Sequence, residues 1–188
     1  MARTEKTMTR ENWLHAALAA LVDGGVEAVR VEPLAAWLGV TKGSFYWHFK
    51  DRPALLAGLL DHWEANFTRG LIDEVSVLPD AADRMRALAR IAIETDAGGL
   101  DNARAEMAML AWAARDEQAA ERQRQIDRIR IGYLESELKD LAVPQPALHA
   151  RTIYHALIGT YATRVYDPDA ASDDAFLTLV DLILDSRP

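Results

Sequence analysis

The chain of 188 residues has the length of one domain, or of one domain with a short appended module. Half of its residues are hydrophobic and its net charge is −8, which excludes a disordered chain and a generally basic nucleic-acid-binding protein. It has no cysteine, so disulfides, thiolate catalysis and cysteine-ligated metal centres are excluded.

Helical periodicity predominates along the chain and predicts an all-α fold of about nine helices. Capping residues and breakers fix the helix ends, such as Thr9 before the first helix, Gly39 after the second and Asp51 before the fourth. We expect helices over residues 9–24, 32–38, 42–48, 52–75, 80–96, 101–114, 116–140, 146–166 and 173–186.

The charge is unevenly distributed along the chain. Residues 1–53 hold seven lysines and arginines against six acidic residues, so they carry +1, and the rest of the chain carries −9. This asymmetry favours two modules with different partners, although +1 over some fifty residues is also compatible with an ordinary neutral segment.

Residues 34–49 have the pattern of a helix-turn-helix. Ala35 is small where two helices would cross, and Gly39 supplies a turn conformation that a Cβ would penalise. Val40 is expected to pack in the corner between the helices, while Phe45 and Phe49, four residues apart, anchor the third helix to the core.

The same pattern leaves a polar and aromatic set facing outward from the third helix: Lys42, Gly43, Ser44, Trp47 and His48. Such a set suits the major groove of DNA. Thr41 and the helix N-terminus can contact phosphates, Lys42 and Ser44 can reach base edges, and Gly43 permits a close approach.

The segment from Gly39 to Leu56, GVTKGSFYWHFKDRPALL, resembles the N-terminal motif of the TetR (tetracycline-repressor-like) family of bacterial transcriptional regulators. The resemblance covers residues 9–60 and includes the upstream amphipathic helix. It implies a dimeric, all-helical repressor, with a helix-turn-helix DNA-binding domain in residues 1–50 and a ligand-binding and dimerisation domain in residues 51–188.

The resemblance also implies roles for individual side chains. Tyr46 and His48 would contact phosphates, Trp47 a base or sugar, and Lys42 and Ser44 would read sequence. Val29-Arg30 stands where the family commonly has hydroxyl residues, so Arg30 is expected to replace a phosphate contact. The expected DNA-binding residues are Arg30, Thr41, Lys42, Gly43, Ser44, Tyr46, Trp47, His48 and Lys50.

Two of these assignments have structural alternatives. The ring of Tyr46 could instead pack in the core with its hydroxyl in water, and Lys50 could be a solvated turn charge, as could Arg52.

Aromatic, methionine and histidine side chains gather in the C-terminal part and could line an apolar effector pocket with a few polar groups. Those expected there are His62, Trp63, Phe67, Met107, Leu110, Tyr133, Tyr154 and Ile158. At helical spacing each could equally be a core residue. His62, Asp61 and Glu64 do not converge on one helix, so neither a metal nor another cofactor is expected.

The last two helices are expected to form a dimer as a two-fold four-helix bundle, because the final helix is too apolar for a solvent-exposed end. The expected interface residues are Leu157, Tyr161, Phe176, Leu177, Val180 and Leu184. The alternative is that the final helix packs only on its own domain.

Together these expectations describe a cytoplasmic repressor. A homodimer would bind a near-palindromic double-stranded DNA operator, and an unidentified hydrophobic or amphipathic small molecule would release it. No membrane partner is expected, since no apolar run approaches the ~18 residues of a span. A ligand-independent regulator or activator stays open, whereas a helical-bundle enzyme lacks support because no catalytic motif is present.

Overall fold

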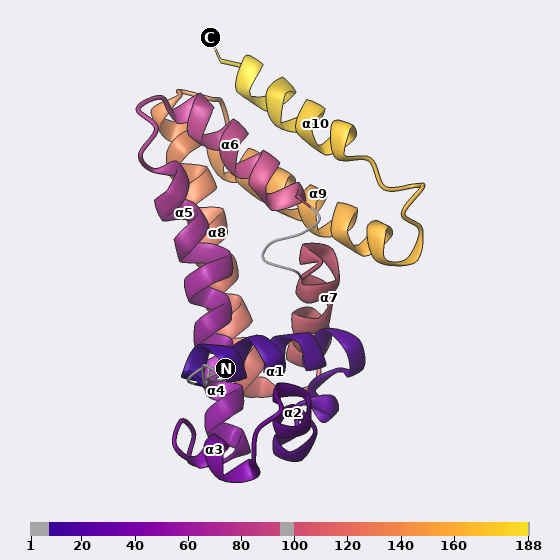
Figure 1. The fold of residues 1–188 in the computed structure, drawn as a ribbon. Helices are drawn as coiled ribbons and strands as arrows, with labels where there is room; N and C mark the ends of the chain where they lie inside the picture. Colours follow the sequence, from indigo (N-terminus) through magenta and orange to yellow (C-terminus); the bar gives the residue numbers. More distant parts are fainter. Residues whose placement is uncertain (1–7, 95–99, 188) are drawn as a thin grey trace, which may run out of the picture. The chain divides into compact units, whose positions relative to one another are not determined.

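The computed structural model describes residues 8–94 and 100–187, and every regular element in these ranges is helical (Figure 1). The chain divides into two compact units, residues 1–63 and 64–188. No helix in the described ranges has the length and apolarity of a transmembrane span.

The first unit contains α1 (Arg10–Gly24), a 3₁₀ turn (Val26–Ala28), α2 (Val31–Leu38), α3 (Lys42–Tyr46) and all but the last residue of α4 (Arg52–Glu64). Helical backbone continues through a π turn (Ala65–Arg69) into α5 (Gly70–Val75). The other helices of the second unit are α6 (Ala81–Ile93), α7 (Asn102–Ala113), α8 (Glu117–Asp140), α9 (Pro146–Tyr166) and α10 (Asp173–Asp185).

The expected all-α fold is confirmed, and with α4 to α5 counted as one run the described residues contain the nine expected helices. Polar N-cap residues explain why the sequence predicts where these helices begin. Thr9 and Asn12 form a reciprocal capping box at α1, and aspartate or serine side chains cap α6, α7, α8 and α10. Residues 95 and 96 of the expected 80–96 helix lie outside the described residues.

An aromatic cluster forms the core of the first unit. Trp13 of α1 meets Phe45 of α3 edge-on with ring centroids 5.3 Å apart, and Phe45 stacks with Phe49 at 5.6 Å. All three side chains are buried. Gly39 ends α2 with φ at 70°, the left-handed conformation that glycine adopts without a Cβ penalty. The core therefore fixes where α3 lies relative to α1 and α2.

The boundary between the units lies within the α4 helical run, 13 residues beyond the end of the DNA-binding domain expected from the sequence. Leu55 and Leu59 of α4 are fully buried, and a Cβ on Gly58 would lie 3.1 Å from Phe49 and 3.4 Å from Leu14. This part of α4 packs closely against α1 and Phe49, so it completes the first unit.

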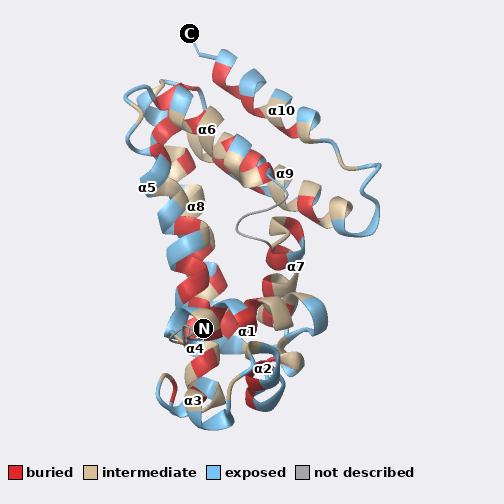
Figure 2. Cartoon of the chain, in the orientation of Figure 1, coloured by how far each residue is buried: buried red, intermediate tan, exposed pale blue. Residues whose placement is uncertain are grey.

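In the second unit, α6, α8, α9 and α10 share one apolar core. Leu138, Ala150 and Leu184 are fully buried in it, and α10 packs on both α6 and α9 (Figure 1). Figure 2 shows α10 with one buried and one exposed face.

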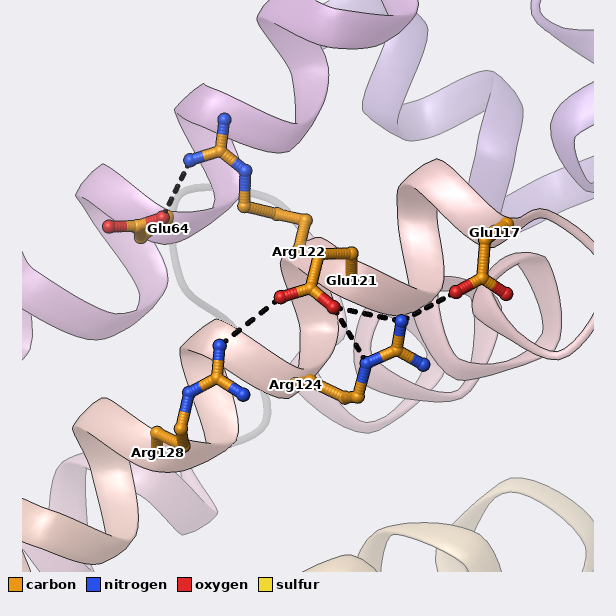
Figure 3. A network of polar contacts seen from close by, with 6 residues as sticks. All are labelled: Glu64, Glu117, Glu121, Arg122, Arg124 and Arg128. Carbon is orange, nitrogen blue, oxygen red and sulfur yellow. Dashed lines mark hydrogen bonds and ion pairs between the residues drawn. The ribbon is translucent and has the colours of Figure 1, made fainter.

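The polar face of α8 carries a ladder of ion pairs (Figure 3). Arg124 bonds Glu117 and Glu121 at 2.6 and 2.9 Å, and Arg128 contacts Glu121 at 3.3 Å. Ile126 lies on the opposite, buried face of the helix. Within residues 121–125 only Glu121 and Arg124 are fully exposed, whereas Gln123 is buried.

Candidate DNA-binding surface and effector core

The outward face of α3 and its flanking residues is the most distinctive surface of the first unit. Trp47 is 87% exposed and Tyr46 is 55% exposed, which is unusual for large aromatic side chains of a small folded unit. Lys42 and Gly43 are exposed as well, and Ser44 and His48 are half-buried. Phe45 and Phe49 hold the segment from the inside, so the amphipathic division expected from the sequence is present.

The remaining expected DNA contacts surround this face. Arg30 is exposed at the N-cap position of α2, and Lys50 is exposed beyond α3. Thr41 is the N-cap residue of α3, but its side chain makes no capping bond there. The ring of Tyr46 does meet Phe45 edge-on at 5.3 Å, so it contacts the core while more than half of the side chain faces solvent.

Lys42 has a partner that the sequence did not reveal. Its ammonium group donates to Glu32 of α2, and both side chains are at least half exposed. The hydrogen bond from Lys42 lowers the pKa of Glu32, and the same bond raises the pKa of Lys42. A ten-residue separation across a turn carries no helical periodicity, so only the folded helix-turn-helix brings the two residues together.

Arg52 has a structural role in place of a solvated turn charge. Its Nε donates to the Val29 carbonyl at 2.7 Å and its Nη2 to the Val26 carbonyl at 2.6 Å. These bonds attach the start of α4 to the turn that leads into α2. Asp51 caps α4 as expected, accepting from the Ala54 amide at 2.8 Å.

Residues 14–59, which cover this helix-turn-helix and the packed part of α4, match the family described as "Bacterial regulatory proteins, tetR family". This match identifies the N-terminal helix-turn-helix domain as one of the TetR family. The transcriptional regulator AcrR of Shigella flexneri is 34% identical over 64 residues, which are 34% of this chain and 30% of that protein. The match thus spans under a third of the length of that relative.

Solved structures extend the likeness to the whole fold. SmeT, the repressor of the Stenotrophomonas maltophilia multidrug efflux pump SmeDEF, superposes with a TM-score of 0.69 at 22% identity, over 96% of this chain and 90% of its own. A Saccharomonospora viridis chain crystallised with choline gives a TM-score of 0.73 at 14% identity, over 94% and 95% of the two chains. At these identities the likeness shows a shared fold, including the helical C-terminal unit.

The residues expected to line an effector pocket fall into two groups. His62 and Trp63 belong to the first unit, where the His62 Nδ1 lies 3.0 Å from a carboxylate oxygen of Glu11 in α1. The other six belong to the second unit, in which Tyr154 is buried and the rest are half-buried: Phe67, Met107, Leu110, Tyr133 and Ile158.

A buried ion pair lies among these second-unit residues. The Nη1 of Arg130 in α8 donates to both carboxylate oxygens of Glu106 in α7 at 2.9 Å, and Glu106 is only 3% exposed. Arg130 also donates to the Thr68 hydroxyl at 3.0 Å and to the Phe67 carbonyl at 3.1 Å, both in the π turn. Burial alone would lower the pKa of Arg130, but the facing Glu106 carboxylate outweighs it and raises that pKa.

A second set of buried hydrogen bonds, centred on Asp127 of α8, lies in the same unit as the Arg130–Glu106 pair. The Tyr154 hydroxyl donates to Asp127 at 2.6 Å, and the Gln123 amide donates to the same oxygen at 2.9 Å. Burial raises the pKa of Tyr154 above the ordinary value of tyrosine. Sequence reasoning missed Glu106, Arg130 and Asp127, because charged residues on helices are usually solvated and the sequence does not mark the buried ones.

The residues expected at a dimer interface are mostly committed to the core of their own chain. Tyr161, Phe176, Val180 and Leu184 are at most 5% exposed, and three of them belong to the apolar core shared by α6, α8, α9 and α10. Leu157 and Leu177 are half-buried. The large apolar side chains that α9 and α10 leave exposed are different ones: Leu148, Val165, Tyr166 and Leu182.

Proposed function

We propose that this TetR-family chain is a DNA-binding transcriptional regulator that acts as a homodimeric repressor. The observation that carries the proposal is the outward face of α3, where Lys42, Tyr46 and Trp47 are exposed on a segment that Phe45 anchors from within. A basic, aromatic and hydroxyl-bearing face of this kind can contact both phosphates and base edges in a major groove.

One copy of α3 is too short to give high specificity alone, so the proposal includes a dimer. Two copies related by a two-fold axis would read two half-sites of a near-palindromic operator, about one helical turn apart. The exposed apolar residues Leu148, Tyr166 and Leu182 on α9 and α10 offer a surface for the second copy. Leu157 and Leu177 are half-buried and would lie at the edge of this dimer surface.

The second unit is proposed to bind a small-molecule effector. A buried ion pair costs desolvation free energy that apolar residues would avoid, so the Arg130–Glu106 pair favours a role beyond stability. Together with Asp127 and Tyr154 it offers polar groups inside an apolar helical core, which suits an amphipathic compound better than a purely hydrophobic one. The effector would release DNA only to the extent that it binds the two conformations with different affinity.

The test is binding of the purified full chain to the intergenic DNA upstream of its own gene. We expect a discrete electrophoretic shift of the DNA with native protein. Tyr46→Ala should lower the affinity by about tenfold or more, because Tyr46 is proposed to contact a phosphate of the DNA backbone. Val77→Ala is the control, because Val77 is also exposed but lies after α5, outside both the proposed DNA-binding surface and the proposed dimer surface. No shift with native protein, or equal losses in both variants, would contradict DNA binding through α3.

Titration of candidate amphipathic compounds into the preformed complex separates induction from ligand-independent regulation. Release of DNA by one compound supports the repressor proposal. If binding persists with every compound that the second unit demonstrably binds, a ligand-independent regulator or activator takes its place.

A further inference from the structure

A cluster of three side chains that can ligate a metal lies in the first unit. None of the three belongs to α3 or to the residues expected to contact DNA. Glu11 and His15 are four residues apart on α1, and His62 approaches them from α4. Their donor atoms all lie within 4.8 Å of one another, and within residues 8–94 and 100–187 no other such group is found. We propose that Glu11, His15 and His62 form a binding site for a divalent transition metal ion, with Zn²⁺ as the reference ion.

The distances between the donor atoms fit such an ion closely. The Glu11 oxygen lies 3.0 Å from the His62 Nδ1 and 3.6 Å from the His15 Nε2. Metal–ligand bonds of about 2.0–2.2 Å in tetrahedral geometry place neighbouring donor atoms roughly 3.4 Å apart. The two observed separations bracket this value, and the third pair of donor atoms, those of His15 and His62, lies within 4.8 Å.

The donor types select the class of ion. Two imidazoles and one carboxylate match the ligand sets of zinc and of neighbouring first-row metals, whereas Ca²⁺ and Mg²⁺ prefer oxygen donors. The His62 side chain is only 3% exposed, while those of Glu11 and His15 are at least half exposed. One wall of the site is therefore protein and the other is open, which leaves room for water as a further ligand.

One cationic side chain, Arg10 on α1, lies near the three donor groups. The nearby Arg10 opposes a divalent charge, but its guanidinium lies over the Phe49 ring, 5.0 Å from the centroid.

Occupancy of the site would connect α1 to α4 and so stabilise the first unit, because metal-binding free energy adds to the stability of the fold that holds the ligands. This inference does not depend on DNA binding or on an effector. The sequence alone hid the site, since Glu11 and His15 have suitable helical spacing but the third ligand lies 47 residues after His15.

The experiment is titration of the full chain, purified without a histidine tag, with Zn²⁺ by calorimetry and with Co²⁺ by visible absorption. Native protein is expected to bind one ion per chain and to give the visible bands of low-coordinate Co²⁺. His15→Ala and Glu11→Gln, both at exposed positions, should each weaken metal binding by more than about tenfold. Loss of a residue that only hydrogen-bonds to a metal ligand already costs about tenfold, and loss of a direct ligand should cost more. His62→Gln should do the same.

His149→Ala is the matched control, because His149 belongs to α9 in the second unit. It should bind the metal as native protein does. Failure of native protein to bind either ion would overturn the proposal, as would His15→Ala and Glu11→Gln variants that bind like native protein. An equal loss in His149→Ala would place the ion elsewhere and also overturn it. The two exposed variants keep the test decisive even if His62→Gln does not fold.

Discussion

At the scale of single residues, Lys42 is a proposed DNA contact whose ammonium group is already paired with Glu32. The Glu32 carboxylate therefore competes with DNA for Lys42. A DNA phosphate or base would have to replace the carboxylate, and Glu32 itself would repel the DNA backbone. Exposed pairs of this kind are weak, so the competition reduces affinity without preventing binding.

Glu32→Gln is therefore expected to tighten binding to DNA, by about two- to fivefold, because it frees Lys42 and removes a negative charge. Fluorescence anisotropy with labelled upstream DNA measures the change. The control is Glu135→Gln, which breaks the 2.6 Å pair with Lys139 on α8 and should leave affinity unchanged. Weaker binding by Glu32→Gln would show that Glu32 positions Lys42 for DNA instead of competing with it.

The buried Arg130–Glu106 pair gives a prediction about stability. Glu106→Gln leaves the guanidinium buried without a counter-charge, so we expect the free energy of unfolding of the second unit to fall by about 3–5 kcal/mol. Urea denaturation followed by circular dichroism measures it. The double variant Glu106→Leu, Arg130→Met should recover most of this loss, and a double variant as unstable as Glu106→Gln would show that the pair does more than neutralise charge.

At the scale of helices, the termini were predictable and the internal irregularity was not. Thr9, Asp51 and Gly39 each mark an end by local chemistry that the sequence shows directly. The π turn at Ala65–Arg69 was missed because its sequence has ordinary helical periodicity. Its Thr68 hydroxyl and Phe67 carbonyl accept from Arg130 of α8, so a distant side chain contacts the irregular turn.

The turn between α2 and α3 can be tested through Gly39. Gly39→Ala should lower stability by about 1 kcal/mol, because alanine is strained at a φ of 70°. Gly132→Ala is the opposite control: in the middle of α8, where a Cβ meets nothing within 4 Å, it should raise stability by up to about 1 kcal/mol. Thermal unfolding of both variants checks the pair, and a stable Gly39→Ala would contradict the importance of this turn.

At the scale of the whole molecule, the sequence predicted which side chains around α3 are exposed better than it predicted which side chains of α10 are exposed. The exposure of Trp47 follows from its position at the C-cap of α3, two residues after the buried Phe45. Whether Phe176 or Leu182 of α10 faces outward depends on packing against α9 and against α6, which is distant in sequence. In the structure Phe176 is buried and Leu182 is exposed. Local amphipathicity identifies an apolar face but not the element that covers it.

The acidic charge of residues 54–188 is consistent with DNA binding by the first unit alone. A net −9 should repel DNA non-specifically and confine attraction to the α3 surface, so that two copies are needed for tight binding.

The proposed dimer surface gives a matched pair of variants. Leu182→Glu, at a side chain 64% exposed on α10, should shift the protein toward monomer in analytical ultracentrifugation and weaken DNA binding with it. Val77→Glu, at a residue 81% exposed after α5, should change neither. A Leu182→Glu protein that stays dimeric would move the interface away from this face of α10.

The most direct test of the central claim, that α3 reads DNA, is the affinity of full-length protein for its upstream operator with Lys42→Ala and Lys139→Ala side by side. Both remove one exposed lysine paired with one carboxylate, so they change net charge equally. Loss of a specific contact predicts about tenfold or more weakening for Lys42→Ala and no change for Lys139→Ala. Equal affinities of the two variants would contradict the claim.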